Sequence, residues 1–145
     1  MGIMKKKAEG LAAMTSREED IMNILWRSSK PLLAKEIAEQ DATLTINTVQ
    51  AVLRKMLKNN WIKVEDIVYS NTVLARTYVP VITAEEYSLA KLEYEYQRLG
   101  SFVKKASLVR QLLKKEDKKT QKEEIHELES MLKEYKKKIN SSKDL

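Results

Sequence analysis

The chain has 145 residues, of which 33% are charged, and it carries a formal net charge of +6. It contains no cysteine, which excludes disulfides, thiolate metal sites and thiol nucleophiles. No apolar run approaches the ~18 residues of a membrane span, and residues 1–14 lack the apolar segment of a signal peptide. We therefore expect a cytoplasmic, mainly α-helical protein with no membrane association, whose basic charge permits a nucleic-acid partner without requiring one.

Residues 1–14 show no periodicity, and we expect a flexible N-terminal arm. Thr15 and Glu18 have the spacing of a capping box, which predicts a helix from residue 16 to about residue 28. Pro31 lies beyond its end, and residues 33–40 predict a second, shorter helix. The apolar residues expected on the buried faces of these two helices are Ile21, Met22, Leu25, Trp26, Leu33 and Ile37.

Residues 46–59 predict a third helix with Thr45 as its N-cap. Its 3.6-residue period separates two faces. The apolar face consists of Ile46, Val49, Val52, Leu53, Met56 and Leu57. The polar face consists of Asn47, Thr48, Gln50, Ala51, Arg54, Lys55 and Lys58 and contains no carboxylate. Three helices in this order have the spacing of a helix-turn-helix.

A polar, cationic helix face has two interpretations. On most amphipathic helices such a face is only solvated surface. Here the lack of any Asp or Glu, in a chain rich in both, favours a surface that meets phosphate. Thr45 also leaves the helix N-terminus, with its positive dipole end, available to a phosphate group. We therefore predict that this face binds double-stranded DNA.

The chain then becomes β-rich, with strands predicted at residues 61–64 and 73–79 and a turn at residues 69–72. Pro80 ends the second strand. Two strands after the third helix indicate a winged helix-turn-helix domain over residues 15–82. Lys63 and Arg76 lie on or beside this wing, where each is either a phosphate contact or plain surface.

Residues 83–140 predict a second domain made of helices, which a capping box at Thr83 opens and Gly100 interrupts. A charged linker at residues 114–119 precedes a third capping box at Thr120. Apolar residues three and four positions apart form stripes along these helices, and such stripes have to be covered. The stripes contain Leu89, Leu92, Tyr96, Leu99, Val109, Leu113, Ile125, Leu128, Leu132 and Tyr135.

About sixty residues in thin helices form little core alone. We therefore predict that the stripes pair two chains and that residues 83–140 are a dimerisation domain. The alternative is a monomer whose stripes fold back on the N-terminal domain. Residues 141–145 are expected to fray.

The residues needed for catalysis are missing. His126 is the only histidine and, without cysteine, it anchors neither a transition-metal site nor a catalytic triad. Carboxylate pairs such as Glu18-Glu19 stand in first helical turns, where the helix dipole explains them. We expect no enzyme, no cofactor and no metal site.

Several short motifs follow one another in a specific order. They are Thr15-Ser16-Arg17-Glu18, Ile24-Leu25-Trp26, Thr45-x-x-Thr48-Val49-Gln50 with Leu53 and Lys58, Tyr78-x-Pro80, Ser107-Leu108-Val109, Lys115-Glu116-Asp117 and Glu123-Glu124-Ile125-x-Glu127-Leu128. In this order and spacing, from about residue 15 to residue 138, the chain resembles the penicillinase and methicillin-resistance repressors, which are grouped with the bacterial copper repressors. The resemblance implies a homodimeric repressor whose winged domains occupy successive major grooves of a palindromic operator.

The resemblance also bears on individual residues. The residues that match Asn47, Thr48, Ala51 and Lys55 lie on the recognition face toward the DNA in that family. Asn47 and Asn60 replace the usual Lys and Gly, so the operator sequence does not carry over.

Repressors of that family are inactivated when a regulatory protease pathway cuts an Asn-Phe bond in the first dimerisation helix. No Asn-Phe pair occurs in this sequence, and Glu95-Tyr96 aligns with that bond. The sequence therefore gives no support to induction by that cleavage, and the lack of cysteine excludes the copper-responsive mechanism.

We predict a sequence-specific transcriptional repressor that acts as a homodimer. Asn47, Thr48 and Lys55 are predicted to read base edges. Thr45, Arg54, Lys58, Lys63 and Arg76 are predicted to contact the DNA backbone. Two alternatives remain open: a winged-helix regulator that senses a small molecule in a pocket between its two domains, and a protein-interaction adaptor without specific DNA binding.

Overall fold

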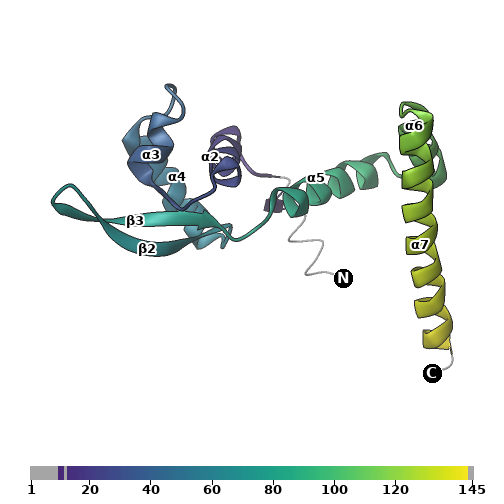
Figure 1. Ribbon diagram of the computed structural model, residues 1–145. Helices are drawn as coiled ribbons and strands as arrows, with labels where there is room; N and C mark the ends of the chain where they lie inside the picture. Colours follow the sequence, from purple (N-terminus) through teal and green to yellow (C-terminus); the bar gives the residue numbers. More distant parts are fainter. Residues whose placement is uncertain (1–9, 12, 144–145) are drawn as a thin grey trace. The chain divides into compact units, whose positions relative to one another are not determined.

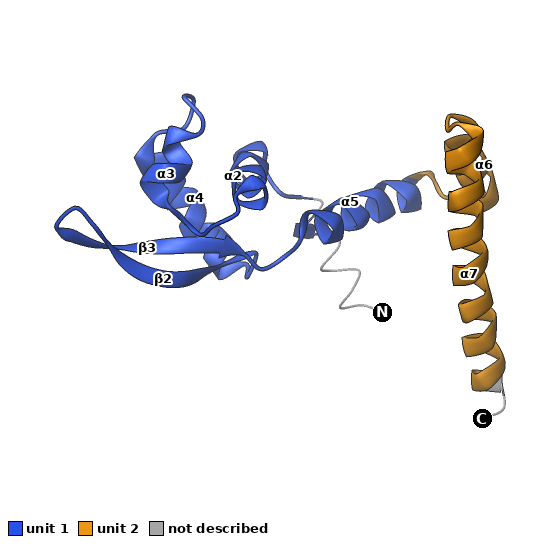
Figure 2. Cartoon of the chain, in the orientation of Figure 1, with its two compact units in different colours: residues 1–98 blue, residues 99–145 orange. Residues whose placement is uncertain are grey.

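The computed structural model describes residues 10–11 and 13–143. The chain divides into two compact units, residues 1–98 and residues 99–145 (Figure 2). The domain boundary predicted from the sequence is residue 83, and where a dimerisation domain begins remains a prediction. None of the described helices combines the length and the apolar composition that a membrane span requires.

The first unit is a winged helix (Figure 1). Its elements are α2 (Ser16–Arg27), β1 (Leu32–Leu33), α3 (Ala34–Glu39), α4 (Ile46–Lys58), β2 (Ile62–Ser70), β3 (Val73–Pro80) and α5 (Ala84–Leu99). The strands form an antiparallel sheet in the order β1-β3-β2, and the tip of the β2–β3 hairpin extends beyond the helices. The predicted fold class, mainly α with a winged helix-turn-helix, is confirmed.

The capping box that opens α2 is also confirmed. The Thr15 N–H donates to Glu18 Oε1 at 2.9 Å, and the Glu18 N–H donates to Thr15 Oγ1 at 3.2 Å. These two bonds satisfy backbone donors that the first turn of a helix leaves free.

The C-terminus of α4 is closed by an Asn in the position usually held by Gly. Asn60 has a φ of 61°, in the left-handed region. Its N–H donates to the Leu57 carbonyl at 3.1 Å, and the Trp61 N–H donates to the Met56 carbonyl at 3.0 Å. This pair of bonds is the Schellman motif, which Gly favours and Asn tolerates.

The wing is longer than predicted, because β2 continues through a β-bulge to Ser70. The register shifts between Val64 and Asp66, so the partner strand has one residue fewer there. The hydroxyl of buried Thr77 accepts the Asp66 N–H at 3.1 Å and donates to the Asp66 carbonyl at 3.2 Å. One side chain thus satisfies both backbone groups that the bulge removes from the ladder. The two-residue strand β1, which pairs Leu32 with Tyr78, was not predicted.

The core lies between α2, α3, α4 and the sheet, and one prediction about it is wrong. Leu11 and Met14 were expected in a flexible arm, yet they are buried, with 3% and 6% of their surface exposed. Residues 1–9 and 12 of that arm lie outside the described residues. Ile46 lies on the apolar side of α4 as predicted, but it is the first residue of the helix and 39% of its surface is exposed. The core residues are Leu11, Met14, Ile21, Met22, Leu25, Leu32, Ile37, Leu44, Val49, Leu53, Met56, Ile62, Ile82 and Tyr87.

The second unit contains α6 (Lys105–Lys114) and α7 (Lys118–Lys143). The helix break predicted at Gly100 is confirmed, since α5 ends at Leu99. The linker predicted at residues 114–119 is shorter than expected, because only residues 115–117 separate α6 from α7, and the capping box predicted at Thr120 is wrong. Asp117 opens α7, and its carboxylate accepts the Thr120 N–H at 2.7 Å, which contributes to holding its pKa below the usual range. Of the residues expected to fray, 141–143 are helical, and 144–145 lie outside the described residues.

Candidate nucleic-acid interface

The outward face of α4 is opposite to the side that packs in the core. Val49, Leu53 and Met56 are buried. Residues spaced by four, three and four positions form the stripe directly opposite to them, and all are exposed: Asn47, Ala51, Arg54 and Lys58. Lys55 and half-buried Thr48 flank this stripe on one side, and Gln50 flanks it on the other. We call these seven residues the α4 face.

The cations of the α4 face are available to an external anion. Within the described part of the chain, Arg54, Lys55 and Lys58 take part in none of the ion pairs, whereas Lys30 is paired with Glu36 at 3.3 Å. An unpaired surface cation meets phosphate without first losing a protein partner. Ala51 is the smallest residue of the face, and it leaves room for a surface to approach the helix closely.

The N-terminus of α4 is capped as predicted. Thr45 Oγ1 accepts the Thr48 N–H at 3.2 Å, and the Thr45 hydroxyl donates to Thr48 Oγ1 at 2.9 Å. The Thr45 hydroxyl is therefore used within the cap, and a phosphate at this position would meet backbone N–H groups of the first turn.

The turn that leads into α4 is held by a residue that the sequence did not reveal. Arg17 of α2 donates through Nη1 to Thr43 Oγ1 at 2.9 Å and lies 3.6 Å from Asp20. The Thr43 hydroxyl donates to Asp41 at 2.6 Å, and this bond is the main reason that the pKa of Asp41 lies below its usual range. Arg17 thus adds an exposed guanidinium beside the start of α4. No local pattern indicates this contact, because 26 positions separate its partners.

The two predicted wing residues lie on different strands. Lys63 of β2 pairs with Glu65 at 3.7 Å, so its charge is partly offset. Arg76 of β3 is exposed and stands opposite Ile67 in the ladder. Tyr69 and Leu74 form the next pair on the same face of the hairpin, with 74% and 58% of their surfaces exposed. This apolar part of the wing was not predicted as part of a site.

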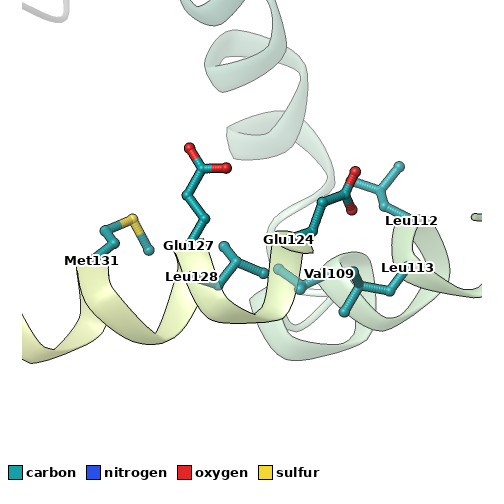
Figure 3. Close-up of a pocket in the computed structure, with 7 residues that line it drawn as sticks. All are labelled: Val109, Leu112, Leu113, Glu124, Glu127, Leu128 and Met131. Carbon is teal, nitrogen blue, oxygen red and sulfur yellow. The ribbon is translucent and has the colours of Figure 1, made fainter. Parts of the chain in front are cut away.

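The residues predicted for dimerisation fall into both units. In the first unit, Leu89, Leu92 and Tyr96 lie on α5. The second unit contains Leu99, the last residue of α5, and six residues of α6 and α7: Val109, Leu113, Ile125, Leu128, Leu132 and Tyr135. Figure 3 shows residues that line a hollow between α6 and α7, among them the apolar side chains of Val109, Leu113 and Leu128 and the carboxylates of Glu124 and Glu127. The hollow has a volume of about 560 Å³.

These features define a winged helix-turn-helix protein with an exposed cationic face on its third helix. The residues that the structure describes contain no group of three metal-ligating side chains. A sequence model of the penicillinase repressor family matches residues 14–134. The chain therefore belongs to the penicillinase repressor family, and it is a transcriptional regulator rather than a member of an enzyme family. The predicted resemblance is confirmed.

Comparisons with individual proteins are more distant. No curated protein matches the chain. Among solved structures, the ferric uptake regulator Fur of Helicobacter pylori, described with three functional metal binding sites, is 17% identical with a TM-score of 0.37, over 57% of this chain and 59% of its own. This chain thus spans less than two thirds of that regulator. Staphylococcus aureus MarR, in complex with salicylate and kanamycin, has the same identity and TM-score, over 79% of this chain and 71% of its own. Both similarities are too distant to assign any property of these two regulators to this chain.

Proposed function

We propose that this protein is a cytoplasmic, sequence-specific repressor that binds a palindromic operator as a homodimer and occludes the promoter. The observation that carries the proposal is the α4 face, which is exposed, free of carboxylates and cationic on the helix that follows the turn. A helix in this position is suited to enter the major groove. Membership of the penicillinase repressor family supports the same function.

The residues of the α4 face have two kinds of role in this proposal. Asn47, Thr48 and Lys55 read base edges, because amide, hydroxyl and ammonium groups match the donors and acceptors of the major groove. Ala51 sits against the floor of the groove. Arg54 and Lys58 contact phosphates, which position the helix without reading sequence.

The remaining contacts lie around this helix. The N-terminus of α4, capped by Thr45, meets one phosphate. Lys63 and Arg76 of the wing add contacts to the flanking backbone, and Arg17 adds a further one beside the turn. Arg76 is the stronger wing candidate, because Lys63 already has Glu65 as a partner.

A second copy of the chain covers the apolar stripes in this proposal. Leu132, Tyr135 and Ile139 on α7 each have more than half of their surface exposed. On α6 and α7 apolar side chains recur along the helices, and Val109, Leu113 and Leu128 border two hollows between these helices. A contiguous apolar surface of this kind is typical of a protein interface.

Binding of the purified protein to DNA from upstream of its own gene tests the proposal. We expect anisotropy titrations at two salt concentrations to show binding that resists scrambled competitor DNA. Equal, salt-sensitive binding to every duplex, including random sequences, would refute specific recognition and favour a protein-interaction adaptor.

A further inference from the structure

Helix α5 has two opposite faces with different surroundings. Tyr87, Ala90 and Lys91 lie on the face toward α2, where Tyr87 is 7% exposed and Ala90 packs against the core. Leu89 and Leu92 lie on the opposite face, with 57% and 65% of their surfaces exposed. The same helix is thus attached to the winged domain on one side and presents leucines on the other.

Three side chains connect α5 to α2, and we call Glu19, Tyr87 and Lys91 the α2–α5 latch. The Tyr87 hydroxyl donates to the Glu19 carboxylate. Lys91 Nζ lies 3.1 Å from Glu19 Oε1 and 5.7 Å from the centre of the Tyr87 ring. The Tyr87 ring packs on Trp26 at 5.5 Å between centroids, and Trp26 Nε1 donates to the Ile82 carbonyl at 2.9 Å.

The protonation states of the latch support its hydrogen bond at neutral pH. The bond from Tyr87 holds the pKa of Glu19 below its usual range, with a smaller effect from Lys91. Burial, together with the Glu19 carboxylate, raises the pKa of Tyr87. The acceptor therefore stays ionised and the donor stays protonated across the physiological range.

The latch joins α5 to the winged domain. A hinge at residue 83, where the sequence predicts a domain boundary, would leave α5 free to swing relative to α4. Instead the first two turns of α5 are fixed to α2, and α2 packs against α4 in the same compact unit. The direction of the Leu89–Leu92 face relative to the α4 face is therefore set by the latch.

We propose that the α2–α5 latch is a positioning element that sets the spacing of operator half-sites. This inference rests on the proposed dimeric repressor. In that dimer the Leu89–Leu92 face meets the partner, so each α5 lies between its own winged domain and the partner chain. The latch then fixes the distance and rotation between the two α4 helices, and a protein with a fixed latch accepts one half-site spacing.

Glu19→Gln and Tyr87→Phe test this proposal, because both keep the size of the side chain while removing the charge or the donor. Glu95→Gln is the matched control, since it breaks an ion pair of 3.3 Å with Arg98 that lies within α5 and does not reach α2. Affinities are measured for the palindrome, for the palindrome with one base pair inserted at its centre, and for a single half-site.

The added base pair rotates one half-site by about 34° relative to the other. We expect the wild type and Glu95→Gln to lose about tenfold or more in affinity, because both half-sites are no longer engaged at once. The latch variants should lose less than about threefold, with unchanged affinity for a single half-site. Unchanged spacing discrimination in both latch variants would overturn the proposal, as would a wild type that tolerates the inserted base pair.

Amide hydrogen exchange of residues 84–91 provides a readout that does not need DNA. We expect these amides to exchange faster in the latch variants than in the wild type or in Glu95→Gln. Unchanged exchange would show that the latch does not hold α5 and would overturn the inference. If the wild type prefers no palindrome, the dimeric repressor fails instead, and the exchange measurement still judges the latch.

Discussion

Replacing Lys58 with alanine should weaken binding to every DNA sequence alike and reduce the salt dependence of binding. Lys58 is exposed on the last turn of α4, and it has no ion-pair partner among the described residues. Removing it should therefore affect phosphate contact and leave folding within about 0.5 kcal/mol of the wild type.

The size of the effect follows from counterion release. Each phosphate neutralised on B-DNA contributes about 0.9 to the slope of log affinity against log salt. A dimer loses Lys58 from both protomers, so the slope should become less steep by about 1.8. Between about 50 and about 200 mM salt, the ratio of wild-type to variant affinity should then shrink by about twelvefold.

Fluorescence anisotropy at four or more salt concentrations measures this slope. Lys137→Ala is the matched control, because it removes the same charge from an exposed position on α7. The reasoning is refuted if Lys58→Ala leaves the slope unchanged, or if Lys137→Ala changes it equally.

Substitutions at four further positions separate recognition, assembly and stability. Ala51→Leu should leave the melting temperature unchanged but lower operator affinity by about tenfold or more, because the larger side chain holds α4 away from the groove. If this variant bound the operator as tightly as the wild type, Ala51 would be excluded from the interface. Leu132→Glu should yield a monomer by sedimentation, because it places a charge in the proposed dimer interface, and a stable dimer would contradict that interface. Thr77→Val should lower the free energy of unfolding by about 1–3 kcal/mol in urea titrations, since both Asp66 backbone groups lose their partner. An unchanged free energy of unfolding would mean that water replaces the hydroxyl. Asn60→Ala should cost about 1 kcal/mol whereas Asn60→Gly should not, and an equal cost for both would contradict the left-handed conformation.

The most accurate sequence predictions concern α4, because its start and its faces depend on residues close together in the sequence. Thr45 as N-cap and the 3.6-residue period predicted both its start and its two faces, and the helix ends at Lys58, one residue before the predicted end. The start of α7 also depends on neighbouring residues, and the sequence offers two N-cap residues for it, Asp117 and Thr120. Asp117 is the N-cap in the structure, in agreement with the stronger N-cap preference of Asp.

The features that could not be predicted depend on contacts between distant residues. Strand β1 exists because Leu32 meets Tyr78, and two residues have no periodicity to detect. Tyr87 lies 68 positions from Glu19, so the latch follows from the packing of α5 on α2 rather than from any motif. The bulge in β2 likewise could not be predicted, because a bulge is defined by how β2 pairs with β3.

Selection of binding sites from a pool of random duplexes tests the central claim most directly, because its outcome does not depend on which genes the protein regulates. The account predicts that the full-length protein enriches an inverted repeat whose half-site centres are about 10 base pairs apart, and that Lys58→Ala loses affinity for it. Enrichment of a single asymmetric site would contradict the symmetric dimer. Failure to enrich any sequence would contradict specific DNA recognition by the α4 face.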